Sequence, residues 1–381
     1  MDFSSKVASK LLLDGLENGE NKNMLTSPLS YNAIMNMTAI GSSGATSDQI
    51  LEFLQHKNIE EVKSEFSKLK EITKTKGGDA PVISFLNGVW INKEYCLKNT
   101  FQEVIERHYN ALVRNIDCKK PEMVVQETNE WASASTKGLI KEVLKTEHIA
   151  PDTTLILGNA LYFKGLWEKE FTKTRTRDYS FHLLNGEQVM VPFMSGCKEY
   201  SHKSFENFQV ARIPYKTGGD QKKKFAMYIF LPVEKDGLQS LLKTVNSDPE
   251  FFIKYSDLPI RNSVDVFRIP KFKFSYLTEK GAGIMKSMGL TLPFDMAKSE
   301  LNEMIEEDRV HVSKIVQKAF IEVNEEGTEA AAVTFAGYVC GCPMYYTPTE
   351  FIADHPFMFI IREENSGVLF FAGTVLNPLE E

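Results

Sequence analysis

The chain has 381 residues, of which 43% are hydrophobic and 25% charged, and its formal net charge at pH 7 is −7. This composition predicts a globular protein with an extensive core, and the acidic balance argues against nucleic-acid binding, which needs a basic face. No linker rich in Pro, Gly or Ser separates two compositions, and no internal repeat is visible. We therefore expect a single domain over residues 1–381.

The start of the chain lacks a basic segment followed by an apolar run, so we predict no secretory signal. The leucine run at 11–13 is far too short to span a membrane. Five cysteines are odd in number and scattered, which suits reduced thiols better than a disulfide framework: Cys96, Cys118, Cys197, Cys340 and Cys342. We expect a cytoplasmic or nuclear protein without a membrane partner, and unconventional export stays open.

In chain order, the apolar spacing changes between helical and strand periods. Helical spacing is found over residues 2–17, 28–40, 48–54, 59–72, 100–109, 124–136, 238–245 and 282–288. Strand patterns are found over residues 82–92, 154–162, 225–231, 264–274, 319–325, 357–362 and 368–375. Residues 178–232 as a whole have a pattern of strands and turns, in which Asn185 and Gly186 form a strong hairpin signal. This mixed order, without regular βαβ alternation, predicts an α+β fold.

The most informative segment is a long loop that begins with two acids and a glycine, Glu325 to Gly327. Gly327 supplies a flexible pivot. Read as a strand, the next residues present one face that is uniformly small: Thr328, Ala330, Ala332, Thr334 and Ala336. The opposite face tolerates an acid and a ring, Glu329 and Phe335. Such a strand could enter a sheet over a packed core, although the Glu-Ala-Ala-Ala run also favours a helix.

The whole chain resembles the serpins through an ordered set of motifs, each weak by itself. They are TSPLS at 26–30, GSSGAT at 41–46, NALYFKGLW at 159–167, FH at 181–182, PFM at 192–194, PKFKF at 270–274, DHPF at 354–357 and GTVLNP at 373–378. The segment EVNEEGTE at 322–329 is similar to the plant branch of that family.

This resemblance implies a fold of three β-sheets with about nine helices and an exposed reactive-centre loop at about 325–350. It implies a suicide-substrate, irreversible inhibitor of serine endopeptidases, with papain-like cysteine endopeptidases as a second target class. The loop is cleaved and inserts as a strand of the central sheet. The expected partner is the target protease in a covalent acyl complex, and the expected state is a monomer without cofactor or metal.

The resemblance also implies site residues. The family's usual spacing from Glu325 puts the reactive bond between Gly341 and Cys342, while a loop shortened by about one residue would move it to Cys340; Tyr338 and Met344 are further alternatives. None of these is basic, so a trypsin-like protease is disfavoured. The hinge comprises Glu325, Glu326, Gly327, Thr328, Glu329, Ala330, Ala331 and Ala332.

The gate of the central sheet maps onto Ser27, Ser30 and Asn159, with Trp167 near the start of insertion. At the gate position where the family usually has a histidine, this chain has Gln317. This departure, with Phe335 and Tyr338, favours the alternative of a non-inhibitory serpin that acts as a binding or chaperone-like protein. Cys340 and Cys342 are either weakly constrained loop residues or a redox-sensitive bait.

Catalysis by the chain itself is not expected. The sequence has no Gly-x-Ser-x-Gly elbow, no His-Glu-x-x-His and no P-loop, and its seven histidines are dispersed. A short basic cluster, Lys222 to Lys224, is interpreted as a solvated loop rather than an anion site.

Overall fold

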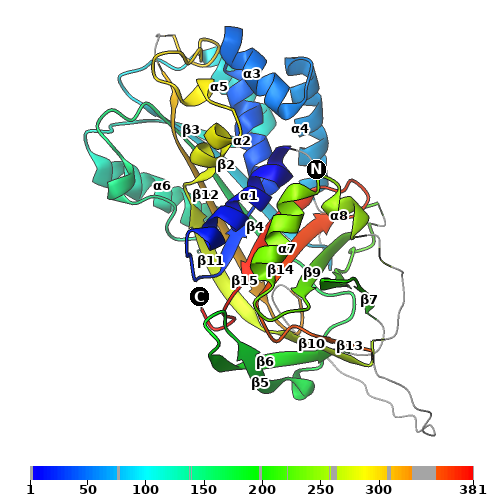
Figure 1. Cartoon of the computed structure of the whole chain (residues 1–381). Helices are drawn as coiled ribbons and strands as arrows, with labels where there is room; N and C mark the ends of the chain where they lie inside the picture. The colour runs from blue at the N-terminus through cyan, green and yellow to red at the C-terminus, as the bar shows by residue number, and fades with distance from the viewer. Residues whose placement is uncertain are drawn as a thin grey trace, which may run out of the picture.

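A computed structural model describes residues 3–74, 78–136, 138, 140–196, 200–220, 222–256, 258, 264–306, 310–327 and 349–380. Within these ranges the strands form three sheets (Figure 1). The five-stranded sheet has the order β11-β12-β4-β2-β3, formed by Phe272–Thr278, Val312–Val323, Leu155–Lys164, Val82–Asn92 and Ala111–Ile116.

The strands of the other two sheets are shorter on the whole, and both sheets lie beside the five-stranded one. A six-stranded sheet has the order β1-β15-β14-β9-β8-β7, formed by Met24–Thr26, Leu369–Val375, Phe357–Glu363, Phe225–Pro232, Phe208–Pro214 and Ser201–Ser204. A four-stranded sheet has the order β13-β10-β6-β5, formed by Glu350–Ile352, Val266–Pro270, Gln188–Gly196 and Arg177–His182.

Nine α-helices are found in the described part of the chain. They are α1 (Phe3–Glu17), α2 (Pro28–Ile40), α3 (Gly44–Leu54), α4 (Ile59–Thr73), α5 (Asn99–Tyr109), α6 (Pro121–Ser135), α7 (Leu238–Ser247), α8 (Phe251–Lys254) and α9 (Gly281–Ser287). Helices α3, α4 and α5 gather at the end of the molecule opposite the four-stranded sheet (Figure 1). The prediction of an α+β fold with three sheets and about nine helices is confirmed.

Helix α2 lies in the middle of the main core. Its sequence has apolar residues on every side, which is typical of a buried helix, and every residue from Pro28 to Ala39 is buried, the polar ones included. Ser27 caps its first turn by accepting a hydrogen bond from the Ser30 amide at 3.2 Å, and Pro28 occupies the first helical position. The helix contacts both β4 and β15, so it joins the five-stranded sheet to the six-stranded one.

A second core lies on the opposite, outer face of the five-stranded sheet, under α6 (Figure 1). Trp90 of β2 packs edge-on against Trp131 of α6, with 5.1 Å between ring centroids. The segment after α6 adds Val143 and Leu144, which pack in the same cluster as residues of β4 and β12. We call the line along which β4 and β12 pair the seam. The seam is therefore covered on both faces of the sheet.

Most predicted elements agree with the observed ones, with differences at the ends. The hairpin is confirmed: Gly186 has φ +85°, and its amide donates to the Leu183 carbonyl at 3.0 Å. The predicted strand at 264–274 is two strands, β10 and β11. The strand predicted to begin at 319 begins at Val312, and the earlier start was missed because Lys314, Gln317 and Lys318 interrupt the apolar pattern of its first half. Strands β1, β3 and β13 were not predicted.

The basic cluster at 222–224 contacts the end of helix α4. The Lys223 ammonium donates to the carbonyl of Glu71 at 2.6 Å and to that of Lys74 at 2.5 Å. These carbonyls belong to the last turn of α4 and its C-cap, where a cation is favourable. The loop at 222–224 therefore stabilises the C-terminal end of α4.

Candidate functional site

The centre of the five-stranded sheet contains a parallel pair of strands. β12 pairs with β4 in parallel, from Val312 opposite Leu155 to Phe320 opposite Tyr162, whereas β12 with β11 and β4 with β2 are antiparallel pairs. After β12 the chain reverses, and the Asn324 amide donates to the Gly327 carbonyl at 2.9 Å. A strand that continued from this reversal into the seam would run antiparallel to both of its neighbours.

Gly327 occupies a position that only glycine fits. Its φ is +151°, and a Cβ there would lie 2.1 Å from the backbone oxygen of Gly165. The residue forms an isolated antiparallel bridge with Leu166. The first turn of the loop is therefore pressed against the chain that follows β4, at the end of the parallel seam.

The carboxylate of Glu325 is buried and held by two donors. Thr176 Oγ1 donates to it at 2.7 Å, and Lys271 Nζ lies 2.9 Å from its other oxygen. Burial alone would raise the pKa of this carboxyl, but the hydrogen bonds from Lys271 and Thr176 outweigh burial and hold the pKa below its ordinary value. Glu325 is therefore ionised at neutral pH in a site from which water is largely excluded.

Glu326 is buried beside it and pairs with Lys173. This hydrogen bond raises the pKa of the Lys173 ammonium, which is itself exposed. The backbone carbonyls of the two acids are also occupied: that of Glu325 accepts from the Phe171 amide at 2.7 Å and that of Glu326 from the Trp167 amide at 3.0 Å. The segment before the loop is thus fixed by side chains and backbone together.

Trp167 lies at this end of the seam. Its indole Nε1 donates to the Asn324 carbonyl at 2.9 Å, and its ring stacks on Tyr215 with 4.5 Å between centroids. Asn324 in turn accepts at Oδ1 from the amides of Glu326 and Gly327, at 3.1 and 3.3 Å. Trp167 therefore lies at the end of the seam where the loop begins, apart from the polar cluster around Gln317, and its role at the start of insertion stays a prediction.

Gln317 lies inside the sheet and is fully buried. Its Oε1 accepts from Thr26 Oγ1 at 2.8 Å and from the Ser27 amide at 3.0 Å, and its Nε2 donates to the Ser27 carbonyl at 2.8 Å. An amide can donate and accept at once, so it satisfies the chain just before α2. Because glutamine does not titrate, this part of the cluster keeps the same charge at every ordinary pH.

The polar cluster continues from Gln317 across two more strands. In the register of the sheet, Gln317 is opposite Asn159, which is opposite Asn87. Ser30 Oγ donates to Asn159 Oδ1 at 2.5 Å, and Asn159 Nδ2 donates to Asn87 Oδ1 at 2.8 Å. Asn87 Nδ2 ends the chain of bonds at the Tyr109 carbonyl, at 2.9 Å. Asn87 and Tyr109 were not predicted; an asparagine inside an apolar strand was the available signal.

The structure therefore brings Ser27, Ser30, Asn159 and Gln317 together as the sequence suggested, and adds residues that the sequence did not nominate: Thr26, Asn87, Lys173, Thr176, Lys271 and Asn324. The proposed reactive bond at Gly341 and Cys342, its alternative at Cys340, and the hinge residues 328–332 lie outside the described residues. Their roles stay predictions.

Two further properties concern only the described ranges. No group of three or more His, Cys, Asp or Glu side chains in them could hold a metal ion. None of their helices is long and apolar enough to cross a membrane.

Comparisons with known proteins agree over the full length. The family model described as Serpin (serine protease inhibitor) matches residues 2–378. Serpin-Z3 of Arabidopsis thaliana is 41% identical, covering 98% of this chain and 96% of the relative, and Serpin-ZXA of Oryza sativa subsp. japonica is 40% identical, covering 95% and 91%. The solved structure of Arabidopsis AtSerpin1 in its native stressed conformation covers 100% of both chains, with a TM-score of 0.86 and 35% identity.

Proposed function

The chain belongs to the serpin family, whose members are typically protease inhibitors, and from this premise we propose that it is a suicide-substrate inhibitor of serine endopeptidases. Papain-like cysteine endopeptidases are the second target class, since the bait residues around Gly341 are small and uncharged. The parallel seam between β4 and β12, with the chain reversed at Gly327 beside it, is the observation that carries the proposal.

The reaction begins as ordinary proteolysis. The protease hydroxyl or thiolate adds to the carbonyl carbon of Gly341, the peptide bond to Cys342 breaks, and the new amino group of Cys342 takes up the proton. The protease is then joined to Gly341 as an ester or thioester. Hydrolysis of that bond would release both proteins, so inhibition requires that loop insertion is faster than hydrolysis.

Insertion uses the geometry of the seam. Fourteen residues, 328–341, span roughly 46 Å at about 3.3 Å per residue, enough to carry an attached protease along the sheet. The new strand would gain ladder hydrogen bonds to β4 and β12 on both sides, in place of the single parallel ladder that it separates. The five-stranded form is then a kinetically trapped state whose conversion waits for cleavage.

The contacts around the seam set the barrier to this conversion. On the inner face, the hydrogen bonds of Gln317 and Asn159 to the Thr26–Ser30 segment have to be broken or exchanged. On the outer face, Val143 and Leu144 pack in one cluster with Val316 of β12 and Ala160 of β4. At the end of the seam, Glu325 is held by Lys271. These contacts oppose opening before cleavage and support the trapped state.

Incubation with elastase-like, chymotrypsin-like and papain-like proteases tests the proposal directly. We expect a complex that survives denaturing electrophoresis, with mass spectrometry locating the acyl bond at residues 340–342. The matched variant Thr328→Arg would place a charge on the small face that must be buried, so we expect it to be cleaved at the same bond with little complex. Clean cleavage of the wild-type chain by all three classes, over a range of ratios, would favour the non-inhibitory alternative.

A further inference from the structure

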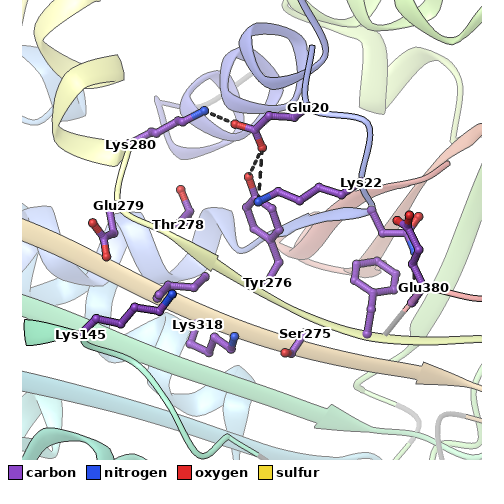
Figure 2. A pocket seen from close by; sticks show the side chains of 13 residues that line it. Glu20, Lys22, Lys145, Ser275, Tyr276, Thr278, Glu279, Lys280, Lys318 and Glu380 are labelled. Atoms are coloured by element: carbon purple, nitrogen blue, oxygen red, sulfur yellow. Dashed lines mark hydrogen bonds and ion pairs between the residues drawn. The ribbon is translucent and has the colours of Figure 1, made fainter. Parts of the chain in front are cut away.

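A cavity of about 490 Å³ opens beside β11, the edge strand of the five-stranded sheet, and extends to β12 (Figure 2). Its volume is within the range of about 300–1,000 Å³ found for ligand pockets. Four lysines from separate parts of the chain line it: Lys22, Lys145, Lys280 and Lys318. None of the residues assigned to the hinge or the gate lines this cavity.

The lysines that line the cavity differ in the acidic side chains near them. Lys280 pairs with Glu20, whose other oxygen accepts from Tyr276 at 2.8 Å, as the dashed lines in Figure 2 mark. Lys22 is 4.0 Å from that same carboxylate and so shares a partner that is already used. Another lining acid, Glu279, pairs with a lysine outside the cavity at 3.3 Å. Glu380 is the third lining acid, so four lysines and three acids leave the lining with an excess of one positive charge, in a chain whose net charge is −7.

Lys318 is the central group. It projects from the outer face of β12 between Val316 and Phe320, which pack in the apolar cluster under α6, and this position leaves it half-buried. Its ammonium forms no hydrogen bond and no ion pair within the part of the chain that the structure describes. Burial lowers the pKa of its ammonium, and the charges of Lys145 and Lys22 add to this against an opposing effect of Glu142. An anion in the cavity would restore the interactions that this cation has lost.

Lys145 and Lys318 are joined along the chain to the two different strands of the seam. Lys145 follows Leu144 in the segment that leads from α6 to β4, whereas Lys318 lies on β12, opposite Ala160 of β4. Figure 2 shows both side chains at the same wall of the cavity. If the segment that carries Lys145 moves with β4, a strand inserted between β4 and β12 would move the two lysines apart by about one strand spacing, about 4.8 Å.

We propose that this cavity binds a small multivalent oxyanion of the phosphate type through Lys318, Lys145 and Lys22, and that the anion favours the five-stranded sheet. A ligand that binds one of two conformations more tightly shifts the equilibrium towards that conformation. The preference for one sheet form rests on the proposed loop insertion, whereas binding to the intact protein does not. An oxyanion held by Lys145 and Lys318 together would then delay insertion.

Calorimetric titration of the intact protein tests the site, with orthophosphate, pyrophosphate and inositol hexakisphosphate as probes and sodium chloride at matched ionic strength as the reference. We expect saturable one-to-one binding that strengthens from orthophosphate to pyrophosphate, and inositol hexakisphosphate shows whether a phosphorylated organic ligand fits as well. Lys318→Met should weaken binding about tenfold or more, because it removes a charged donor. Lys273→Met, an exposed lysine on β11 outside the cavity, should leave it unchanged.

Two results would overturn the proposal. If the probes show no saturable binding beyond that of sodium chloride at matched ionic strength, or if both lysine variants lose binding equally, the effect is general screening and no site exists. The link to the sheet is tested by repeating the titration on protein cleaved in its loop. We expect at least tenfold weaker binding there; equal binding by a cleaved form that has become heat-resistant refutes the link. If the cleaved form has not become heat-resistant, loop insertion itself is refuted. The titration of the intact protein still decides whether the cavity binds oxyanions.

Discussion

The contact between Lys271 and Glu325 offers the most informative single perturbation of the hinge. Glu325 is 5% exposed, and Lys271 Nζ lies 2.9 Å from its carboxylate. Replacing Lys271 by methionine keeps much of the side-chain volume and removes the charge. The carboxylate then keeps only Thr176 as a side-chain donor in a buried site.

The magnitude follows from the burial of the two partners. A hydrogen bond to a charged group contributes about 1.5–3 kcal/mol to stability. The Lys271 side chain is 36% exposed, so solvent screening reduces this value, and we expect Lys271→Met to cost about 1–2 kcal/mol. The loss applies to the intact form, which holds the start of the loop in this place.

Two assays measure this effect. The midpoint of urea unfolding should fall for the intact variant, and spontaneous conversion to a heat-resistant form, followed by native electrophoresis, should become faster. Lys273→Met is the matched control, since Lys273 lies on the neighbouring strand β11, is exposed and pairs with Glu322 at 3.4 Å; it should change stability by less than about 0.5 kcal/mol. Equal behaviour of Lys271→Met and the control would refute the hinge role of this pair.

Three other predictions address the same region. Gln317→Ala should lower the free energy of unfolding by about 2–4 kcal/mol in urea titrations, because it removes the acceptor of the buried Thr26 hydroxyl and of the Ser27 amide, and one of the donors to the Ser27 carbonyl; a loss below about 1 kcal/mol would mean that water replaces the amide. Gly327→Ala should cost about 2 kcal/mol or more by the same assay, owing to its φ and to the clash with Gly165, and wild-type stability would show that the turn adapts. The pKa of Glu325 in the folded protein lies below its ordinary 4.5, so the stability that the carboxylate contributes is complete above about pH 4.5 and is lost as the pH falls through the folded pKa. Glu325→Gln should make the midpoint of urea unfolding depend less on pH over this acidic range. Parallel curves of midpoint against pH for the variant and the wild type would exclude the linkage.

Elements with strong local signals could be predicted from the sequence. The central strand β4 is nearly continuous in apolar residues and is buried on both faces, as the run at 154–162 indicated. Helix α2 has an N-cap serine, a proline at its first position and apolar residues on every side. In both cases the residues that decide the element are adjacent in sequence, so periodicity and capping are sufficient.

The start of β12 could not be predicted in the same way. Residues 312–318 contain Lys314, Gln317 and Lys318, which break the apolar pattern of a central strand. The two lysines lie on the outer face and the amide is satisfied by Thr26 and Ser27, which are 290 and more residues away in sequence. A strand whose polar groups find distant partners gives no local signal.

The partners of the hinge show the same limit. The two acids at 325 and 326 were recognised from their place before the loop, but the donors that hold them were not. Thr176 is 149 residues from Glu325, and nothing in its surroundings in sequence marks it as a partner. Contacts of this kind depend on which loops the sheets bring together.

The central claim is that the seam between β4 and β12 accepts the cleaved loop as a new strand. The most direct test is to cleave the loop with a small amount of protease, verify the cut by mass spectrometry, and compare thermal unfolding of the cleaved and intact proteins by circular dichroism. We predict that the cleaved protein unfolds at a far higher temperature than the intact one. Equal unfolding temperatures after complete cleavage near Gly341 would contradict insertion, and with it the proposed mechanism of inhibition.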